Sequence, residues 1–524
     1  MSKLELLDTT LRDGAQAEGV SFSVEDKISI VRALDALGIP LIEAGNPASN
    51  PKEQNFFDRI AVLPLRHAQI AAFGATRRKG MAADADEGLA ALLRTGVRTV
   101  VIFGKCWDLH VDRVLNVSLS ENLDMISETV QWLCAQNRQV IFDAEHFFDG
   151  YKKTPDYALE ALTRAHAAGA ARLVLCDTNG GCFPHEITEA VEAVKAHLPD
   201  AVLGMHSHND TGCAVANTIA AVRAGATHIQ GTYLGFGERC GNADFSTLIP
   251  NLQLKLGYDC IPADHMPLLT STARSIAETA NLTVRRFAPY VGDFAFSHKA
   301  GMHAAGVLKC TESFEHIDPE TVGNTRHFLV SEMAGKRAIA KKVEQLLPAV
   351  RCDEEMLTVL AARLKELEHR GYQFEGAEGS FLMLIRKELK LYTPSFELIS
   401  YKVLDERPYD HGRSATATLK LRVGEMVKIA AADGDGPVNA LDKALREALS
   451  EFYPVMQSVR LIDYKVRVIE PKEATAAVVR VLITSTDGQS VWSTIGVSHD
   501  IIEASFIALV DSVEYALREE SPRP

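Results

Sequence analysis

The feature that most constrains the fold of this chain is a strand–loop–helix pattern that recurs from residue 4 to about residue 240. Each unit begins with a short apolar run, continues through a polar loop and ends in a segment with the apolar period of an amphipathic helix. Eight units over about 240 residues match a closed barrel of eight parallel strands in length and count. The apolar runs are Leu4–Leu7, Leu41–Ala44, Ile70–Phe73, Thr99–Phe103, Val140–Ala144, Arg172–Cys176, Val202–Met205 and His228–Leu234.

The expected helix ends agree with this pattern. Ser23 precedes an amphipathic segment, Val24–Leu37, and Asp26 lies three residues further on, as in a capping box. Gly38 ends that helix, and Pro155 begins another. We therefore predict an α/β fold that starts with a (β/α)8 TIM barrel. A doubly wound open sheet is the structural alternative.

Two histidines follow the seventh apolar run. Residues two apart on a strand point to the same side, so His206 and His208 can present both imidazoles to one point. Two imidazoles suit a divalent cation but leave its coordination incomplete, and such pairs are also common as hydrogen-bonded structural residues. Asp13, just after the first run, is the best third ligand, and Asn242, after the eighth run, could bind the metal directly or through water. Asp8 is the alternative carboxylate, although its place at the end of the first strand better suits orienting Arg12 or closing the turn.

Composition and charge exclude several functional classes. The chain has 524 residues, of which 55 are basic and 69 acidic, and its net charge of −14 disfavours nucleic acid and anionic membranes as partners. No run approaches the roughly 18 apolar residues of a membrane span, and the amino terminus lacks the apolar core of a signal peptide. Nine scattered cysteines without a C-x-x-C motif are typical of reduced thiols. We expect a cytoplasmic protein that binds no nucleic acid and no membrane.

The periodicity changes after the barrel. Residues 261–396 are mostly helical in pattern, whereas residues 397–520 alternate like strands, with helical stretches at 438–451 and 501–517. The last segment reads as two halves, each with strands followed by a helix. We predict a catalytic barrel over residues 1–260, then a mainly helical linker subdomain, and then a C-terminal α+β regulatory domain.

Motifs at three of the expected strand ends resemble those of the DRE-TIM metallolyases, in their synthase branch. This branch comprises the 2-isopropylmalate, homocitrate and citramalate synthases. The resemblance covers nearly the whole chain, because two further motifs resemble the carboxyl-terminal regulatory domain of these synthases. The five motifs are Asp8–Gly14 (DTTLRDG), Gly204–Gly212 (GMHSHNDTG), Gly237–Ala243 (GERCGNA), Gly434–Ala440 (GDGPVNA) and Gly496–Ser505 (GVSHDIIEAS).

The resemblance implies a Claisen-type condensation of acetyl-CoA with a 2-oxo acid, followed by thioester hydrolysis. The segment Asn46–Lys52 (NPASNPK) and the loop around His298 are most similar to the citramalate synthase group, so pyruvate is the expected oxo acid. The alternatives are 2-oxoisovalerate or 2-oxoglutarate, as in the sister synthases, a bond-breaking lyase of the same superfamily, and a non-catalytic ligand sensor. Acetyl-CoA is the expected co-substrate, and the metal is expected to be Mg²⁺, Mn²⁺, Zn²⁺ or Co²⁺.

The residues at the barrel mouth suit this reaction. The metal would chelate the oxo acid and polarise its ketone. Arg12 would stabilise the developing oxyanion, Thr178 would donate to the substrate carboxylate, and Gln16 would orient ligand or substrate. Glu145 and His303, acting together, are the candidates for the base that removes a proton from the acetyl methyl group.

Four further expectations concern three single residues and the C-terminal domain. Phe103 is expected to line the oxo-acid pocket, where its bulk would favour the methyl group of pyruvate. The relatives often carry a tyrosine where this chain has Phe314, so a water or another residue must replace that hydroxyl. Cys240 is expected to be a small buried thiol rather than a nucleophile. The C-terminal domain is expected to bind isoleucine or another branched-chain amino acid at the interface of a homodimer.

Overall fold

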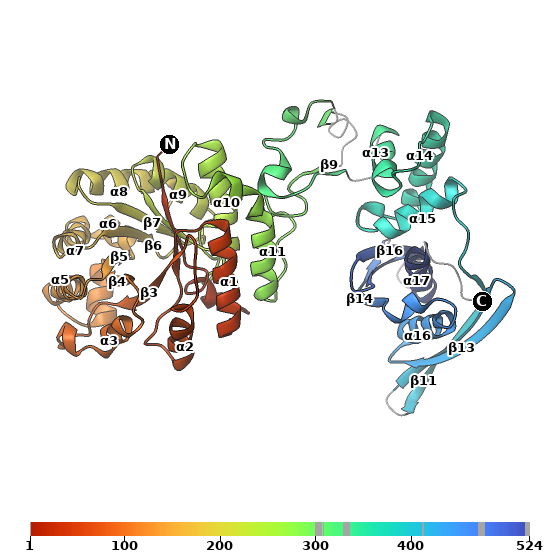
Figure 1. The fold of residues 1–524 in the computed structure, drawn as a ribbon, viewed down its shortest axis with the longest axis horizontal. Coiled ribbons are helices and arrows are strands. Elements are labelled where there is room, and N and C mark those ends of the chain that lie inside the picture. Colours follow the sequence, from red (N-terminus) through yellow and green to blue (C-terminus); the bar gives the residue numbers. More distant parts are fainter. Residues whose placement is uncertain are drawn as a thin grey trace. The chain divides into compact units, whose positions relative to one another are not determined.

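The computed structural model describes residues 2–298, 306–307, 309–328, 336–410, 413–469 and 477–518. The chain forms two compact units (Figure 1). The first comprises Met1–Phe296 and Ile317–Arg326, and the second comprises Ser297–His316 and His327–Pro524. None of the helices formed by the described residues is long and apolar enough to cross a membrane.

Eight parallel strands close into the barrel that the sequence predicts, so the doubly wound alternative is wrong. Strand β1 pairs with both β2 and β8, which closes the sheet. Helices surround the strands in the first unit (Figure 1), which explains why the strands are continuous apolar runs. The strands are β1 (Glu5–Asp8), β2 (Leu41–Glu43), β3 (Gln69–Ala75), β4 (Thr99–Lys105), β5 (Gln139–Glu145), β6 (Arg172–Asp177), β7 (Leu203–Ser207) and β8 (His228–Gly231).

Local signals set the helix ends of the first unit. The capping box of α1 (Val24–Leu37) is present, because the Ser23 hydroxyl accepts from the backbone N–H of Asp26 and the Asp26 carboxylate accepts from that of Ser23. Gly38 ends the helix with a φ of 96°, as predicted. The other helices are α2 (Pro51–Ile60), α3 (Glu87–Arg94), α4 (Asp108–His110), α5 (Leu119–Ala135), α6 (Phe147–Lys153), α7 (Pro155–Ala167), α8 (Pro184–His197), α9 (Ala214–Arg223), α10 (Phe245–Pro250) and α11 (Leu269–Thr279).

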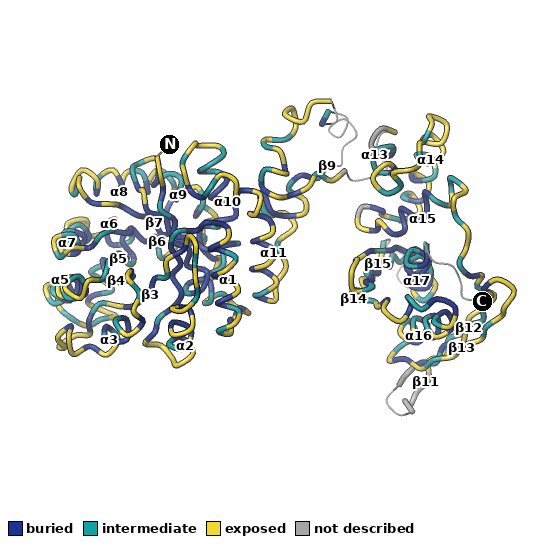
Figure 2. Tube along the Cα trace, viewed as in Figure 1, coloured by how far each residue is buried: buried dark blue, intermediate teal, exposed yellow. Residues whose placement is uncertain are grey.

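Two apolar layers stabilise the barrel. The larger layer lies between the outer faces of the strands and the surrounding helices, where the chain is buried (Figure 2). The smaller layer fills the interior of the barrel, and Phe73 packs against it. The polar groups at the carboxyl ends of the strands therefore rest on an apolar floor. The residues of this floor are Leu7, Leu41, Ala71, Val101, Ile141, Val174 and Cys176.

The second unit contains helices followed by two similar halves. A short parallel pair, β9 (Ser297–His298) with β10 (His327–Phe328), precedes the helices α13 (Lys336–Leu346), α14 (Glu354–His369) and α15 (Glu378–Glu388). Each half has three antiparallel strands and then a helix, which confirms the expected repeat. The strand β16 was not predicted. The halves are β11 (Glu397–Asp410), β12 (Arg413–Val423), β13 (Met426–Gly434) and α16 (Pro437–Ser450), then β14 (Arg460–Val468), β15 (Val479–Thr486), β16 (Val491–Ser498) and α17 (Ile501–Leu517).

Candidate metal centre and active site

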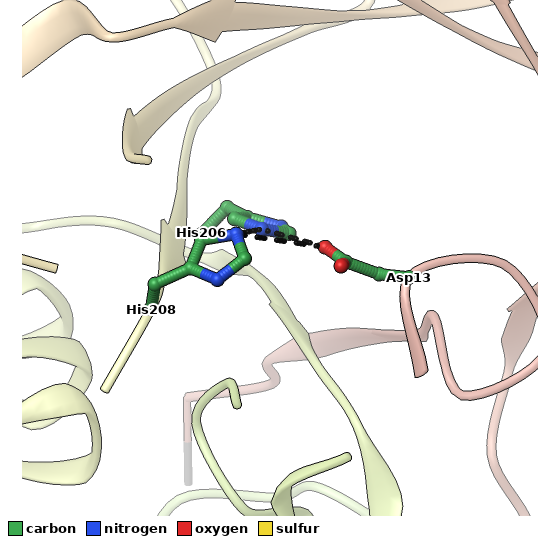
Figure 3. A group of neighbouring side chains, drawn as sticks. All are labelled: Asp13, His206 and His208. Atoms are coloured by element: carbon green, nitrogen blue, oxygen red, sulfur yellow. Dashed lines mark hydrogen bonds and ion pairs between the residues drawn. The ribbon is translucent and has the colours of Figure 1, made fainter. Parts of the chain in front are cut away.

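Strand β7 brings two imidazoles to the carboxyl end of the barrel. His206 lies in the strand and His208 directly follows it, and both residues are only 5% exposed. The two Nε2 atoms lie 3.4 Å apart. Because residues two apart on a strand face the same side, both rings point into the same space, as Figure 3 shows.

Asp13 completes the group from the loop after β1. Three successive backbone N–H groups in this loop donate to the carbonyl of Thr9, and the resulting tight turn directs the Asp13 side chain toward β7 (Figure 3). The Asp13 Oδ2 atom lies 3.2 Å from His206 Nε2 and 3.7 Å from His208 Nε2. Ligand atoms about 2.1 Å from one metal ion lie about 3.0–3.4 Å apart. Two of the three separations lie in this range and the third is slightly longer, so a small movement of His208 toward Asp13 would let the triad hold a single ion. The predicted ligands therefore converge.

Asn242 contacts the triad from the loop after β8. Its amide nitrogen lies 3.0 Å from Asp13 Oδ2 and 3.3 Å from His206 Nε2. Its Oδ1 atom is buried without a hydrogen-bond partner among the described residues. The two orientations of an amide have the same shape, so half a turn of this group would direct its oxygen at the triad. Gly237 leaves the room this needs, because a Cβ there would lie 2.0 Å from Asn242 Oδ1.

Arg12 is held between two carboxylates and an aromatic ring. Its Nε donates to Glu43 Oε2 at 2.5 Å, its Nη1 lies 3.4 Å from Asp13 Oδ2, and its Cζ lies 4.0 Å above the Phe73 ring. Glu43 is fully buried, so its ion pair with Arg12 is shielded from solvent. Although burial opposes the charge, the two carboxylates raise the pKa of Arg12. The guanidinium therefore remains a fixed positive charge beside the triad.

The barrel mouth contains more buried acids than buried cations. Burial raises the pKa of Asp8 and of Asp143 to about 7, and it also raises that of Glu43. Burial acts in the same direction on Asp13, but the neighbouring Arg12 and histidines hold its pKa well below the usual range. Asp13, Glu43 and Asp143 thus share the Arg12 guanidinium, and additional positive charge at the triad would favour the ionised forms of these carboxyl groups.

The two histidines differ in their protonation. Burial disfavours a charge on both rings. The hydrogen bond to Asp13 outweighs burial at His206 and raises its pKa, whereas burial together with the charge on His206 lowers the pKa of His208 to about 4. His208 is therefore neutral at pH 7, which is the form that binds a metal ion.

The triad opens into a cavity of about 260 Å³, a size that suits a small organic acid. The residues predicted from the sequence to bind substrate or to catalyse line this cavity wherever the structure describes them. Asn242 contacts the triad without lining the cavity. The lining residues are Arg12, Asp13, Gln16, Phe73, Phe103, Asp143, Glu145, Cys176, Thr178, His206, His208 and Glu238.

Thr178 and Glu145 are oriented by their neighbours. The Thr178 hydroxyl oxygen accepts a hydrogen bond of 2.9 Å from the backbone N–H of His146, which leaves the hydroxyl hydrogen available to a ligand. Glu145 forms an ion pair with Lys105 from the neighbouring strand β4. This pairing holds the Glu145 carboxylate in the cavity that it lines, where a general base could act.

Two expectations fall on the segment after the barrel. His303 lies outside the described residues. Phe314 follows a short turn, Thr311–Ser313, in the second unit, and it is 44% exposed.

Two other expectations concern Cys240 and Asp8, which lie within the motifs. Cys240 is exposed, so the expected buried thiol is wrong. Its neighbours Arg239 and Gly241 both have left-handed backbone conformations, with φ of 56° and 83°, in the turn that carries Cys240. Asp8 closes the turn after β1, as expected, because its Oδ1 accepts from the backbone N–H of Thr10 at 2.9 Å.

Several contributors to the site were not predicted. Phe73 packs under Arg12, Lys105 pairs with Glu145, and Gln230 hydrogen-bonds to His206. Gln230 could have been noticed, since it is a polar residue next to the apolar Ile229 in the eighth run and strand residues alternate in direction. The other two contacts depend on barrel closure and have no local signal.

Comparison with known proteins agrees with this geometry. The HMGL-like family profile matches residues 3–276, the homocitrate synthase post-HMGL domain-like profile matches residues 290–372, and the LeuA allosteric (dimerisation) domain profile matches residues 375–517.

Curated relatives extend over almost the whole chain. The (R)-citramalate synthase of Aquifex aeolicus is 48% identical and covers 99% of this chain and 98% of its own length. That of Geobacter sulfurreducens is 46% identical with the same coverage. A probable 2-isopropylmalate synthase of Methanopyrus kandleri is 34% identical over 98% of this chain and 99% of its own length. The chain therefore belongs to the HMGL-like family and, within it, to the group of the (R)-citramalate synthases.

Proposed function

We propose that this chain condenses acetyl-CoA with pyruvate and hydrolyses the resulting thioester, so that (R)-citramalate and CoA are released. The observation that carries the proposal is the convergence of Asp13, His206, His208 and Arg12 on one small cavity. The identity of 48% to a curated (R)-citramalate synthase supports the same activity. The enzyme is a metal-dependent acyltransferase.

The residues present fit a divalent metal. Asp13, His206 and His208 would hold it, with the amide oxygen of Asn242 as a further ligand. The unpartnered Oδ1 of Asn242 and the excess of buried carboxyl groups both support a bound cation. One carboxylate with two imidazoles suits Mg²⁺, Mn²⁺, Zn²⁺ or Co²⁺. When bound, the ion would act as a Lewis acid that polarises the ketone of the oxo acid.

Arg12, Thr178 and Gln16 would bind and orient the oxo acid. The Arg12 guanidinium is fixed by Glu43 and Phe73, so it can face the ketone oxygen and stabilise the negative charge that develops there. The Thr178 hydroxyl would donate to the substrate carboxylate, because its oxygen already accepts from a backbone N–H. Gln16 lines the same cavity and would hold the substrate in the reactive orientation.

Glu145 would act in proton transfer, together with His303. The base takes a proton from the acetyl methyl group, the resulting enolate carbon forms a bond to the ketone carbon of pyruvate, and the ketone oxygen takes up a proton. Water then attacks the thioester carbonyl, and the C–S bond breaks to release CoA as a thiol. The ion pair with Lys105 holds the Glu145 carboxylate in place for this step.

The choice of pyruvate rests on two aromatic rings in the cavity. Phe103 stacks on Phe73, with their ring centroids 5.3 Å apart. These rings restrict the space for the side chain of the oxo acid, and one methylene is worth about 1–3 kcal/mol of discrimination. The sister substrates 2-oxoisovalerate and 2-oxoglutarate are larger than pyruvate, which makes them the second candidates.

The C-terminal half would form the homodimer interface and bind an effector. The match to the LeuA allosteric (dimerisation) domain supports dimerisation. Two strands expose apolar side chains, and Tyr464, Val466 and Val468 alternate along one face of β14, as expected of a surface that a second copy covers. Isoleucine is the proposed effector, and its failure to bind the full chain in calorimetry would overturn that assignment. The exposed apolar residues are Val427 and Ile429 on β13, and Ile462, Tyr464, Val466 and Val468 on β14.

A cytoplasmic location is also part of the proposal, and the nine cysteines, all free thiols, support it.

The activity is tested by thiol release from acetyl-CoA with a panel of oxo acids. The panel contains pyruvate, 2-oxobutyrate, 2-oxoisovalerate, 2-oxoglutarate and glyoxylate, and chiral chromatography identifies the product. We expect thiol release with pyruvate and formation of (R)-citramalate. A preference for a larger oxo acid would assign the chain to a sister activity. Absence of thiol release with every acid, in the presence of added metal, would favour the lyase or the ligand-sensor alternative.

A further inference from the structure

The two metal-binding histidines differ in what holds them. The His208 Nδ1 atom is buried without a hydrogen-bond partner among the described residues. The His206 Nδ1 atom lies 2.8 Å from Gln230 Oε1. Gln230 is therefore the group that can determine which nitrogen of His206 carries the proton.

Gln230 is fully buried on β8, next to the strand that carries His206. The register pairs Met205 with Ile229, so the residues that follow them, His206 and Gln230, face the same side of the sheet. The Gln230 Nε2 atom also donates to Asp143 Oδ1 at 2.8 Å. Asp143 belongs to β5, which lies three strands away around the barrel. One side chain thus connects the metal triad with a carboxylate on another strand.

The orientation of the Gln230 amide follows from these two contacts. The reversed amide would place its oxygen 2.8 Å from a carboxylate oxygen of Asp143, which is unfavourable while Asp143 is ionised. In the observed orientation, Gln230 Oε1 accepts from Nδ1–H of His206. When a cation takes the place of the Nε2 proton, the remaining proton would reside on Nδ1, and the Nε2 lone pair would face the space shared with Asp13 and His208.

We propose that Gln230 is a positioning residue for the metal centre. It keeps His206 in the form whose Nε2 can bind a cation. It also fixes the orientation of the ring, because Gln230 is itself held by its hydrogen bond to Asp143 on β5. This role rests on the proposed metal-dependent function. Outer partners of metal-binding histidines typically contribute 10–100-fold, by order of magnitude, to metal affinity. None of the five sequence motifs contains Gln230.

The test measures metal affinity rather than turnover. The full chain is freed of metal with a chelator and titrated calorimetrically with Mn²⁺ and, separately, with Zn²⁺. Gln230→Met removes the acceptor while keeping a similar length, and we expect Kd to rise by about 10–100-fold. In Gln230→Glu, the new carboxyl group and that of Asp143 share one proton, so the glutamate still offers an oxygen as acceptor to His206. We expect the Kd of this variant to lie within about threefold of wild type.

A matched control separates positioning from general damage. Asn217 is also fully buried, and its amide donates to the backbone carbonyl of Cys182 at 2.8 Å, away from the triad. Asn217→Leu should lower the melting temperature and leave Kd unchanged. A Gln230→Met chain with Kd within about twofold of wild type would overturn the proposal, as would equal weakening by methionine and glutamate. A wild-type chain that binds neither ion would overturn the metal-dependent function itself, and this role with it.

A second measurement uses the unaltered chain, in case the methionine variant does not fold. In zinc-loaded protein with ¹⁵N-labelled histidine, the proposal expects His206 bound through Nε2 with a protonated Nδ1. Binding through Nδ1 would overturn it.

Discussion

Asp8 is a buried acid whose ionisation should make the stability of the chain depend on pH. Its side chain is fully buried at the end of β1, where Oδ1 accepts from the backbone N–H of Thr10 and Oδ2 has no partner among the described residues. Burial, aided by the nearby negative charge of Glu43, raises its pKa from 3.8 to about 7. The folded state therefore binds this proton more tightly than the unfolded state does.

The sign and size of the effect follow from that pKa. A raised folded-state pKa contributes stability that is fully present below about pH 4 and is lost as the pH rises through 7. A shift of about three units at 1.36 kcal/mol per unit corresponds to about 4 kcal/mol in total. About 3 kcal/mol of this loss should fall between about pH 5 and pH 9, because Asp8 in the folded chain ionises within that window.

The substitution Asp8→Asn tests this reasoning. Asparagine keeps the acceptor for the backbone N–H of Thr10 but cannot ionise, so the pH-dependent loss of unfolding free energy should disappear. Any effect of the new amide on stability is the same at every pH, so it does not change the difference between two pH values. Thermal melting of the barrel from pH 5 to pH 9 should show wild type losing roughly 5–10 °C relative to Asp8→Asn. Asp58→Asn, at an exposed position of α2, controls for the loss of one acidic residue. Parallel profiles for wild type and Asp8→Asn would refute the argument.

Further predictions concern the metal, the substrate and the dimer. Arg12→Lys keeps the charge but loses the planar fork, so kcat should fall about 10²–10³-fold in the thiol-release assay, and an unchanged kcat would exclude the oxyanion role. Phe103→Ala should improve kcat/KM for 2-oxoisovalerate relative to pyruvate by about tenfold or more, whereas unchanged selectivity would remove Phe103 from the pocket. Mn²⁺ affinity should decrease as the pH falls toward and below 7, because protons compete with the metal for His206, whose pKa is raised. Calorimetry at several pH values measures this, and a constant Kd would contradict it. In light scattering, Val466→Asp should be a monomer, whereas Lys465→Asp, on the opposite face of β14, should remain a dimer. Dimers in both variants would contradict the proposed interface.

The barrel could be predicted from the sequence because its signals are local. Apolar runs, capping residues and helix-opening prolines recur often enough to define eight strands and their order. Strand β16 was missed because its burial depends on α17. A Cβ at Gly496 would lie only 1.9 Å from the carbonyl oxygen of Ala504, so this glycine permits a close approach that no local pattern reveals.

Some residues of the candidate site could likewise be predicted from the sequence, whereas others depend on tertiary contacts. Asp13, His206 and His208 could be identified because parallel strands of a barrel present their carboxyl ends at one face. The bridge from His206 through Gln230 to Asp143 could not, since it joins strands whose side chains meet only inside the closed barrel. The exposure of Cys240 likewise depends on the backbone conformation of its loop, which residue type alone does not determine.

The central claim is that Asp13, His206 and His208 hold a divalent metal on which the condensation depends. It is tested most directly by thiol release from acetyl-CoA with pyruvate before chelation, after chelation and after Mn²⁺ is restored, in wild type and in His208→Asn. We predict that wild type loses and then regains its rate, while His208→Asn fails to regain it at the same Mn²⁺ concentration. Full activity of the chelated wild type, or complete recovery of His208→Asn, would contradict the account.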